Sequence, residues 1–163
     1  MLLVENTKIN VGAIVLANTG DNSGKPVSMK LYKHLTVIVA IQPASGTDTC
    51  AITLKQATAV GNFGGALEKT LAFTDVWKNG DLTASDTLVR TAVVANSVTT
   101  SALAAKELYV FEIDAETLDI SNDYDCVNVH VTDPGSVSTP MCITTILSEP
   151  KYSSSTLPSA TID

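Results

Sequence analysis

The sequence predicts an all-β fold: an antiparallel β-sandwich of the jelly-roll kind with at most short helical turns. The chain is rich in Thr, Val, Ala and Ile, and in several segments apolar residues occupy every second position, as they do in half-buried strands. Turn sequences rich in Gly, Asn, Asp and Pro separate these segments. Seven or eight short strands divided in this way are typical of a sandwich or barrel.

The clearest strand is HLTVIVAIQ, at residues 34–42. Alternate residues beginning with Leu35 and ending with Ile41 are all apolar and share one face, while Ile38 and Ala40 add apolar groups to the other face. A strand that is apolar on both faces is expected near the centre of a sheet. Further strands are expected at residues 12–17, 50–58, 87–95, 107–113, 125–132 and 141–148, with a weaker one at 67–74.

Helix is expected to be scarce. The best candidate covers residues 115–120, about one turn. The side chain of Asp114 could accept hydrogen bonds from the first free backbone N–H groups of this turn. Residues 101–106 form a weaker second candidate. Trp77, in the segment DVWKNGD, is expected to lie on a loop and to anchor that loop to the core.

The length of 163 residues suits one domain, and a chain of this size buries roughly 70% of the surface that it exposes when unfolded. We expect residues 1–149 to form the sandwich, preceded by a short N-terminal arm. From residue 150 the sequence becomes small, polar and proline-broken, so residues 150–163 are expected to form an extended tail, either disordered or laid on a neighbouring subunit.

The net charge of −7 disfavours a nucleic-acid partner, because the average surface would repel phosphates. A membrane partner is not expected either. The longest apolar run, residues 37–41, is too short to span a bilayer, and the apolar N-terminus reaches Glu5 and Asn6 before it forms a signal-peptide core. These features indicate a protein made in a cytosol.

The three cysteines, Cys50, Cys126 and Cys142, are odd in number and lack CxxC spacing. This argues against a disulfide framework or a zinc site and favours buried or strand positions. One pair could still form a bridge if neighbouring strands brought the two Cα atoms within roughly 7 Å.

The segment GNFGG, residues 61–65, is the part of the chain that most resembles a phosphate-binding loop. A P-loop requires GxxxxGK[ST], and here the last glycine is followed by Ala66 and Leu67. A dinucleotide fingerprint is absent as well. We therefore interpret the segment as a hairpin turn in which Phe63 is a candidate for exposure.

Acidic residues cluster in EIDAETLDISNDYD, residues 112–125, which raises the possibility of a calcium site. Asp119, Ser121, Asp123 and Asp125 mimic the spacing of an EF-hand loop, but Tyr124 stands where glycine is required and His130 where glutamate is required. A solvated corner between two strands is the favoured interpretation, with calcium as the alternative.

Catalytic chemistry finds little support. Cys126 and His130 are expected on the same outward face of one strand, about 13 Å apart, which is too far for both to bind one ion. The GxSxG elbow of hydrolases is absent. The sequence does not exclude a glycoside hydrolase in which two carboxylates from distant segments come together. However, one Trp, three Phe and four Tyr provide few aromatic rings on which a sugar could stack. We expect no enzyme, no cofactor and no metal.

Five sequence segments, taken in order, resemble those of a known protein family. They are KPVSMKLYKHLTVIVAIQ, AITLKQATAV, VWKNGDLTASDTLVR, FEIDAETLDISNDYDCVNV and the closing KY...LPSATID. From about Gly24 to Asp163 the chain resembles the capsid decoration or cement proteins of tailed bacteriophages. The resemblance implies a structural virion protein that binds the outside of a phage shell and stabilises it across capsomer joints. It implies the major capsid protein and neighbouring copies, as a trimer or another homo-oligomer, as partners.

The implied location is the capsid exterior, after synthesis in the cytoplasm of a host bacterium. A component of the tail or head-to-tail junction, or a receptor-binding module on the same scaffold, is the alternative. The candidate interface residues are apolar groups in the N-terminal arm, the glycine-rich turn and the tail. They are Leu2, Leu3, Phe63, Tyr152, Leu157 and Ile162.

Overall fold

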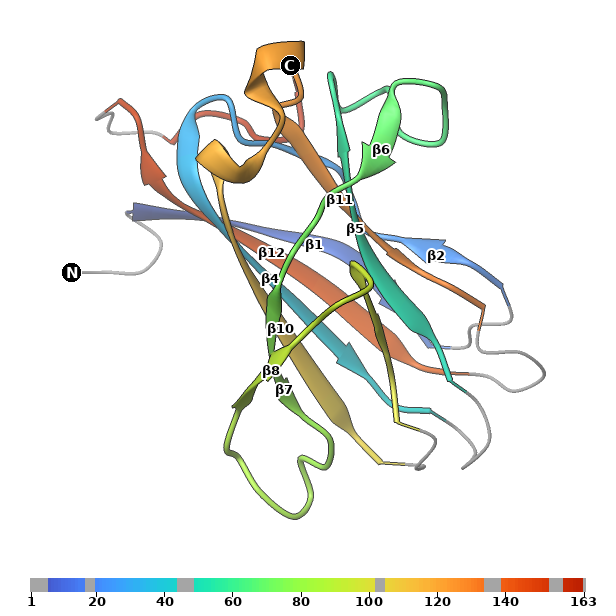
Figure 1. Ribbon diagram of the computed structural model, residues 1–163. Coiled ribbons are helices and arrows are strands. Elements are labelled where there is room, and N and C mark those ends of the chain that lie inside the picture. Colours follow the sequence, from blue (N-terminus) through green and yellow to red (C-terminus); the bar gives the residue numbers. More distant parts are fainter. Residues whose placement is uncertain are drawn as a thin grey trace.

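A computed structural model of the chain describes residues 6–16, 20–43, 49–101, 105–133, 139–152 and 157–162. Within these ranges the chain forms strands and two short 3₁₀ turns, arranged as two antiparallel sheets that pack face to face (Figure 1). The predicted all-β sandwich with at most short helical turns is confirmed.

The two sheets, which we name sheet A and sheet B, have six strands each. Sheet A has the order β1 (Thr7–Val15), β12 (Met141–Pro150), β4 (Tyr32–Ile41), β10 (Glu107–Asp114), β7 (Asp75–Asn79) and β8 (Val89–Ala92). In sheet B, β11 (Cys126–Val131) lies between β5 (Ala51–Ala57) and the short strands β2 (Asn22–Ser23) and β3 (Val27–Ser28). The short strands β6 (Glu68–Thr70) and β9 (Ser97–Thr99) both pair with β5.

The order of the strands is that of a jelly roll. The chain passes back and forth between the sheets, and its first long strand, β1, ends up beside its last, β12. Four strands of sheet A thus follow the order β1-β12-β4-β10 and face the order β2-β11-β5-β6 of sheet B. The β7–β8 hairpin is an addition that extends sheet A beyond β10 (Figure 1).

The core lies between the sheets and follows from the alternation along the strands. In β4 the predicted inward residues, from Leu35 to Ile41, are 0–3% exposed. They meet Ile52 and Leu54 of β5 and the valines of β11, all buried. Burial of each such side chain contributes about 1.5–3 kcal/mol, so this alternation accounts for the pairing of the two sheets.

The helical turns are shorter than predicted. Residues 115–120 were expected to form one turn, and the structure has two 3₁₀ turns there, η1 (Ala115–Thr117) and η2 (Ile120–Asn122). The Asp114 side chain does not cap η1, because its carboxylate contacts the ring of His34 instead. Of the second predicted turn, residues 102–104 lie outside the described residues.

One sequence-based position is wrong. Trp77 does not anchor a loop: it lies in strand β7 with 42% of its surface exposed, because the strand alternates and Val76 is its buried member. Cys126 shares with His130 the face of β11 opposite the core valines, as predicted, but it is not exposed there. It is fully buried, and its thiol donates to Asp125 Oδ1 at 3.2 Å.

Cys50 and Cys126 are buried and Cys142 is half-buried, and no two of these cysteines are joined by a disulfide. The predicted tail begins one residue inside β12, which ends at Pro150. Further along, residues 157–162 lie against the chain's own body: Ser28 N–H donates to the carbonyl of Ala160 and the Tyr32 hydroxyl donates to that of Pro158, both at 2.7 Å. Ala160 is 1% exposed, so this part of the tail covers the sandwich.

Candidate interaction surface

The outer face of sheet A, the side turned away from sheet B, carries a row of side chains that crosses all six strands. Residues directly opposite each other in an antiparallel ladder project to the same face. The registers between neighbouring strands therefore align one residue from each strand. From β1 to β8 the row is Val11, Thr144, Ile38, Val110, Trp77 and Arg90.

Apolar side chains continue on both sides of this row near β1 and β12. One neighbouring row contains Ile9 and Ile146, and the other contains Ile14, Cys142, Ala40 and Leu108. On β1 the exposure is high, at 50% for Val11 and 71% for Ile14. Four strands roughly 4.8 Å apart and three rows roughly 6.7 Å apart cover on the order of 400 Å². Thr144, Thr36 and Glu112 interrupt this area, so its apolar part is smaller and lies mainly over β1, β12 and β4. Exposed apolar patches of a few hundred Å² are often functional.

A shallow groove of about 320 Å³ lies at the end of this face where β1 ends and β12 begins. Its centre is lined by the small residues Ala40 and Cys142. Larger apolar side chains line it as well: Ile14 and Leu16 come from the end of β1, and Leu82 comes from the β7–β8 connection. The groove gives the apolar face a depression into which side chains of a partner protein can fit.

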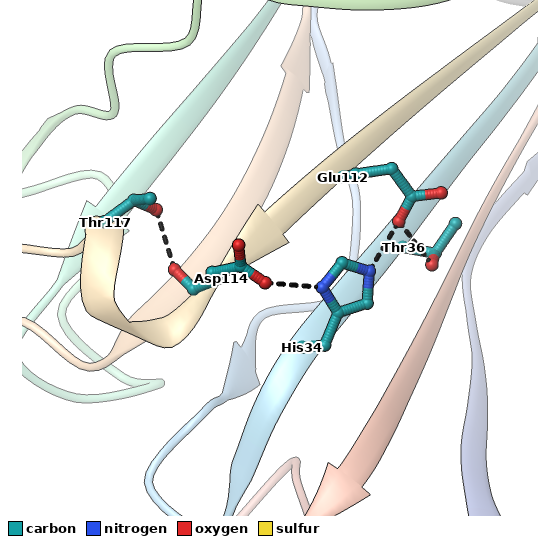
Figure 2. A network of polar contacts seen from close by, with 5 residues as sticks. All are labelled: His34, Thr36, Glu112, Asp114 and Thr117. Atoms are coloured by element: carbon teal, nitrogen blue, oxygen red, sulfur yellow. Dashed lines mark hydrogen bonds and ion pairs between the residues drawn. The ribbon is translucent and has the colours of Figure 1, made fainter.

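The opposite end of the face is polar and is organised by His34 (Figure 2). Its ring contacts two carboxylates of β10: Nδ1 lies 2.7 Å from Asp114 Oδ1, and Nε2 lies 2.7 Å from Glu112 Oε2. The Thr36 hydroxyl donates to the same Glu112 oxygen at 2.8 Å. The register of β4 and β10 explains the cluster, because it sets Asp114 opposite His34 and Glu112 opposite Thr36.

The electrostatics of this cluster favour the imidazolium form. Partial burial is the strongest influence on the His34 pKa and lowers it, but the hydrogen bonds to Asp114 and Glu112 and the charges of these two groups together outweigh burial. The pKa of His34 therefore lies above its usual value of 6.5. Both ring nitrogens are occupied by carboxylates, which leaves neither nitrogen free to activate a nucleophile or to bind a metal.

In the acidic segment of residues 112–125, a lysine occupies the position at which the predicted alternative would bind a calcium ion. Lys69 Nζ pairs with Asp119 Oδ2 and lies 3.9 Å from the centre of the Tyr124 ring. Lys69, followed by Asn122 and Ser121, lowers the pKa of Asp119 to about 2. Within the described ranges no group of three or more His, Cys, Asp or Glu side chains is arranged to hold a metal ion.

Of the predicted interface residues, those that the structure describes do not lie on the outer face of sheet A. Leu2 and Leu3 lie outside the described residues. Phe63 is half-buried in the β5–β6 turn, where Gly64 has φ 82° and its N–H donates to the Glu68 carboxylate at 2.7 Å. GNFGG is thus a hairpin turn, as predicted.

The tail residues lie elsewhere. Tyr152 and Ile162 are 70% and 73% exposed, and Leu157 is half-buried. Ile162 lines a small depression of about 170 Å³ with Ser28, Lys30 and Leu31.

The apolar face itself was not predicted. The signal for it was present in the central strand, where Ile38 and Ala40 make the second face of residues 34–42 apolar, and in β12, where Ile146 does the same. Such a strand is expected to be covered on both faces. The structure covers one face with sheet B and leaves the other without a covering element among the described residues.

Comparisons with known proteins give weak likenesses only. No protein-family model matches the chain, and no curated protein matches it. Among solved structures, the SPBc2 prophage-derived protein YomS is 14% identical, with 91% of this chain and 98% of that chain covered and a TM-score of 0.44.

Two viral structures are also similar. A chain of Triatoma virus is 8% identical over 95% of this chain and 70% of its own, with a TM-score of 0.43. The tobacco streak virus coat protein is 9% identical over 94% of both chains, with a TM-score of 0.36. All three TM-scores lie below 0.5. No described helix is long and apolar enough to cross a membrane.

Proposed function

We propose that this protein is a structural component of a phage virion that binds the outer surface of the capsid and stabilises the shell across the joints between capsomers. The observation that carries the proposal is the uncovered apolar face of sheet A. Burial of such a face stabilises a complex by roughly 25 cal/mol per Å² before the costs of association are subtracted. One copy contributes modestly, and repetition over a shell multiplies the effect.

The rigidity of the scaffold supports this role. The face is built on the long strands β1, β12, β4 and β10, whose inner sides form the core. Its shape is therefore fixed before a partner arrives, and little conformational entropy is lost on binding. The net charge of −7 supports a position outside the shell, away from packaged DNA.

The test is binding of purified protein to shells of the encoding phage that lack it. We expect Ile14→Asp to reduce occupancy at least about tenfold, because a carboxylate would be buried without a partner in the contact. Val94→Asp is the matched control, since Val94 is 99% exposed and lies outside the face. Stabilisation is measured as the shift in the temperature at which the shells release their DNA, with and without each variant.

The tail is tested separately and with point variants. Because Pro158 and Ala160 contact the sandwich, removal of residues 151–163 would disturb the body as well as any contact with a partner. Tyr152→Ser and Ile162→Ser change exposed side chains only. Unchanged occupancy of both variants would assign no role to these two residues, and unchanged occupancy of Ile14→Asp would contradict a contact through sheet A.

Cryo-electron microscopy of the particle decides between the capsid and the other virion locations. Density for this protein over the capsomer joints is the expected result. Density confined to the neck or the tail would replace the proposed position with the junction or receptor-binding alternative.

A further inference from the structure

A second depression, of about 380 Å³, lies at the polar end of the outer face, between β7 and β10. It exists because β7 pairs with β10 only from Trp77 to Asn79, opposite Leu108 to Val110. Before Trp77 the chain leaves the ladder on its way from sheet B, so the end of β10 has no strand beside it on this side among the described residues. The gap between the two diverging strands forms the pocket.

The floor of the pocket is apolar and rigid. Phe73 and Ile113 line it, and the Phe73 ring packs edge-on against Phe111 of the core, with 5.2 Å between the ring centres and an angle of 87°. Trp77 forms one wall, with an indole that is partly exposed. An exposed aromatic ring beside a preformed depression provides a flat apolar surface for a ligand.

Polar groups with unused hydrogen-bonding capacity stand on both sides of this surface. Arg90, directly opposite Trp77, donates from Nη2 to Asp75 Oδ2 at 2.8 Å and has further N–H groups that face solvent, since its side chain is 62% exposed. On the other wall, Glu112 accepts through Oε2, and among the described residues its Oε1 is left available. Figure 2 shows this carboxylate between His34 and Thr36, with Thr117 on the neighbouring turn.

We propose that this pocket binds a neutral saccharide. A sugar ring presents an apolar C–H face, which fits the Trp77 indole, and hydroxyls that both donate and accept, which fit Glu112 and Arg90. The charges select against other ligands. Arg90 and Asp75 neutralise each other, and the carboxylates of Glu112 and Asp114 around His34 disfavour an anion.

The proposal does not depend on the virion role, because it uses a different part of the face and a different chemistry. The pocket volume is in the range of small-ligand sites, at their lower end. An open pocket covers one side of a sugar, so we expect a dissociation constant on the order of 1 mM for a monosaccharide.

Trp77 is the only tryptophan of the chain, so its fluorescence reports on this pocket alone. The probes are glucose, galactose, mannose, N-acetylglucosamine, maltotriose and chitotriose, titrated into the full-length protein. At least one probe is expected to produce a saturable change in Trp77 emission and to protect the indole from quenching by acrylamide. Absence of a saturable change with all six probes would overturn the proposal.

Variants separate the pocket from nonspecific effects. Arg90→Gln and Glu112→Gln are each expected to weaken binding of the responding sugar at least about tenfold, while Val94→Ala, at a 99% exposed position away from the pocket, is expected to leave it unchanged. Arg90 lies on the edge strand β8 and is largely exposed, so its substitution is compatible with folding, which urea unfolding checks. Equal binding by all three variants would contradict the assignment, as would tighter binding of glucose 6-phosphate or tetramethylammonium than of any neutral sugar.

Discussion

His34 lies between Glu112 and Asp114 with a pKa above 6.5, which makes its contribution to stability dependent on pH. A raised folded-state pKa means that the imidazolium stabilises the native state fully below the unfolded pKa and ceases to do so as the pH rises through the folded pKa. We expect His34→Gln to cost roughly 0.5 kcal/mol at about pH 5.5, since the pair is partly exposed and screened, and less at about pH 9.

Urea unfolding of both proteins at the two pH values measures this difference. The variant Glu112→Gln/Asp114→Asn should abolish the dependence on His34. A loss of equal size at both pH values would show that shape, and not charge, is what His34 contributes.

Glu107 is a buried carboxyl group at the far end of β10, with 0% of its surface exposed. Its Oε2 accepts the Tyr109 hydroxyl at 2.5 Å and the Ser101 N–H at 3.1 Å, while Oε1 has no hydrogen-bond partner within the described part of the chain. Burial, followed by the hydrogen bond to Glu107, raises the pKa of Tyr109 far above its usual value.

The substitution Glu107→Ala removes the acceptor of two buried donors and should lower the free energy of unfolding by about 2 kcal/mol or more. Glu107→Gln keeps an acceptor oxygen in place and should cost less. Chemical denaturation at neutral pH compares the two variants. If the glutamine variant proves as unstable as the alanine variant, the negative charge and not the acceptor is the stabilising feature.

At the residue scale the sequence predicted classes of environment but not partners. His34 begins the strand predicted at residues 34–42, and its carboxylate neighbours come from residues 112 and 114 of the predicted acidic segment. Their meeting depends on the register between β4 and β10, strands about seventy residues apart in the chain. A shift of one residue would place the same side chains on the opposite face, and no local pattern fixes that shift.

Among the strands, β1 contains a bulge at Gly12 that lets the chain cross close beneath it. The register shifts between Val11 and Ala13, and a Cβ atom at Gly12 would lie 2.6 Å from the backbone nitrogen of Lys25 and 3.1 Å from Gly24 Cα. We expect Gly12→Ala to cost about 1–3 kcal/mol, because backbone must move to admit the methyl group. Gly61→Ala is the control, since no atom lies within 4 Å of that position.

Thermal unfolding of the two glycine variants tests the close crossing. The Gly12 variant should melt several degrees lower, and the Gly61 variant should melt near the wild-type temperature. Similar melting of both variants would mean that the segment around Lys25 can move away without loss, and that the bulge does not determine how β1 packs.

The elements themselves were predictable in proportion to their alternation. Strands β4, β5, β10, β11 and β12 lie within a few residues of their predicted positions, because each alternates clearly over six residues or more. β2, β3, β7 and β9 were missed: they are two, two, five and three residues long, and propensity over so few residues is outweighed by the neighbours with which they pair.

At the scale of the whole molecule, the jelly roll depends on the pairing of β1 with β12, which joins residues 7–15 to residues 141–148. The sequence predicts β12 and the sandwich class, but of β1 it predicts only the end, because the strand was expected at residues 12–17 and begins at Thr7. The choice of partner follows from closure of the two sheets and not from either strand alone. The same closure leaves β1 as an edge strand with an exposed apolar face, which is the surface most available for association between copies.

Association of purified protein tests that surface without any shell. Each copy carries a net charge of −7, so copies repel one another at low ionic strength, and salt should strengthen an apolar contact by screening this repulsion. We expect sedimentation velocity to show a larger associated fraction at about 0.5 M than at about 0.05 M salt.

Ile14→Lys makes the net negative charge smaller and so weakens the repulsion between copies. It should nevertheless reduce the associated fraction, because a lysine would have to be desolvated in the contact. Val94→Lys makes the same change of charge at an exposed position outside the face and should not reduce association. Dissociation on addition of salt would instead indicate ionic contacts and would contradict association through the apolar face of sheet A.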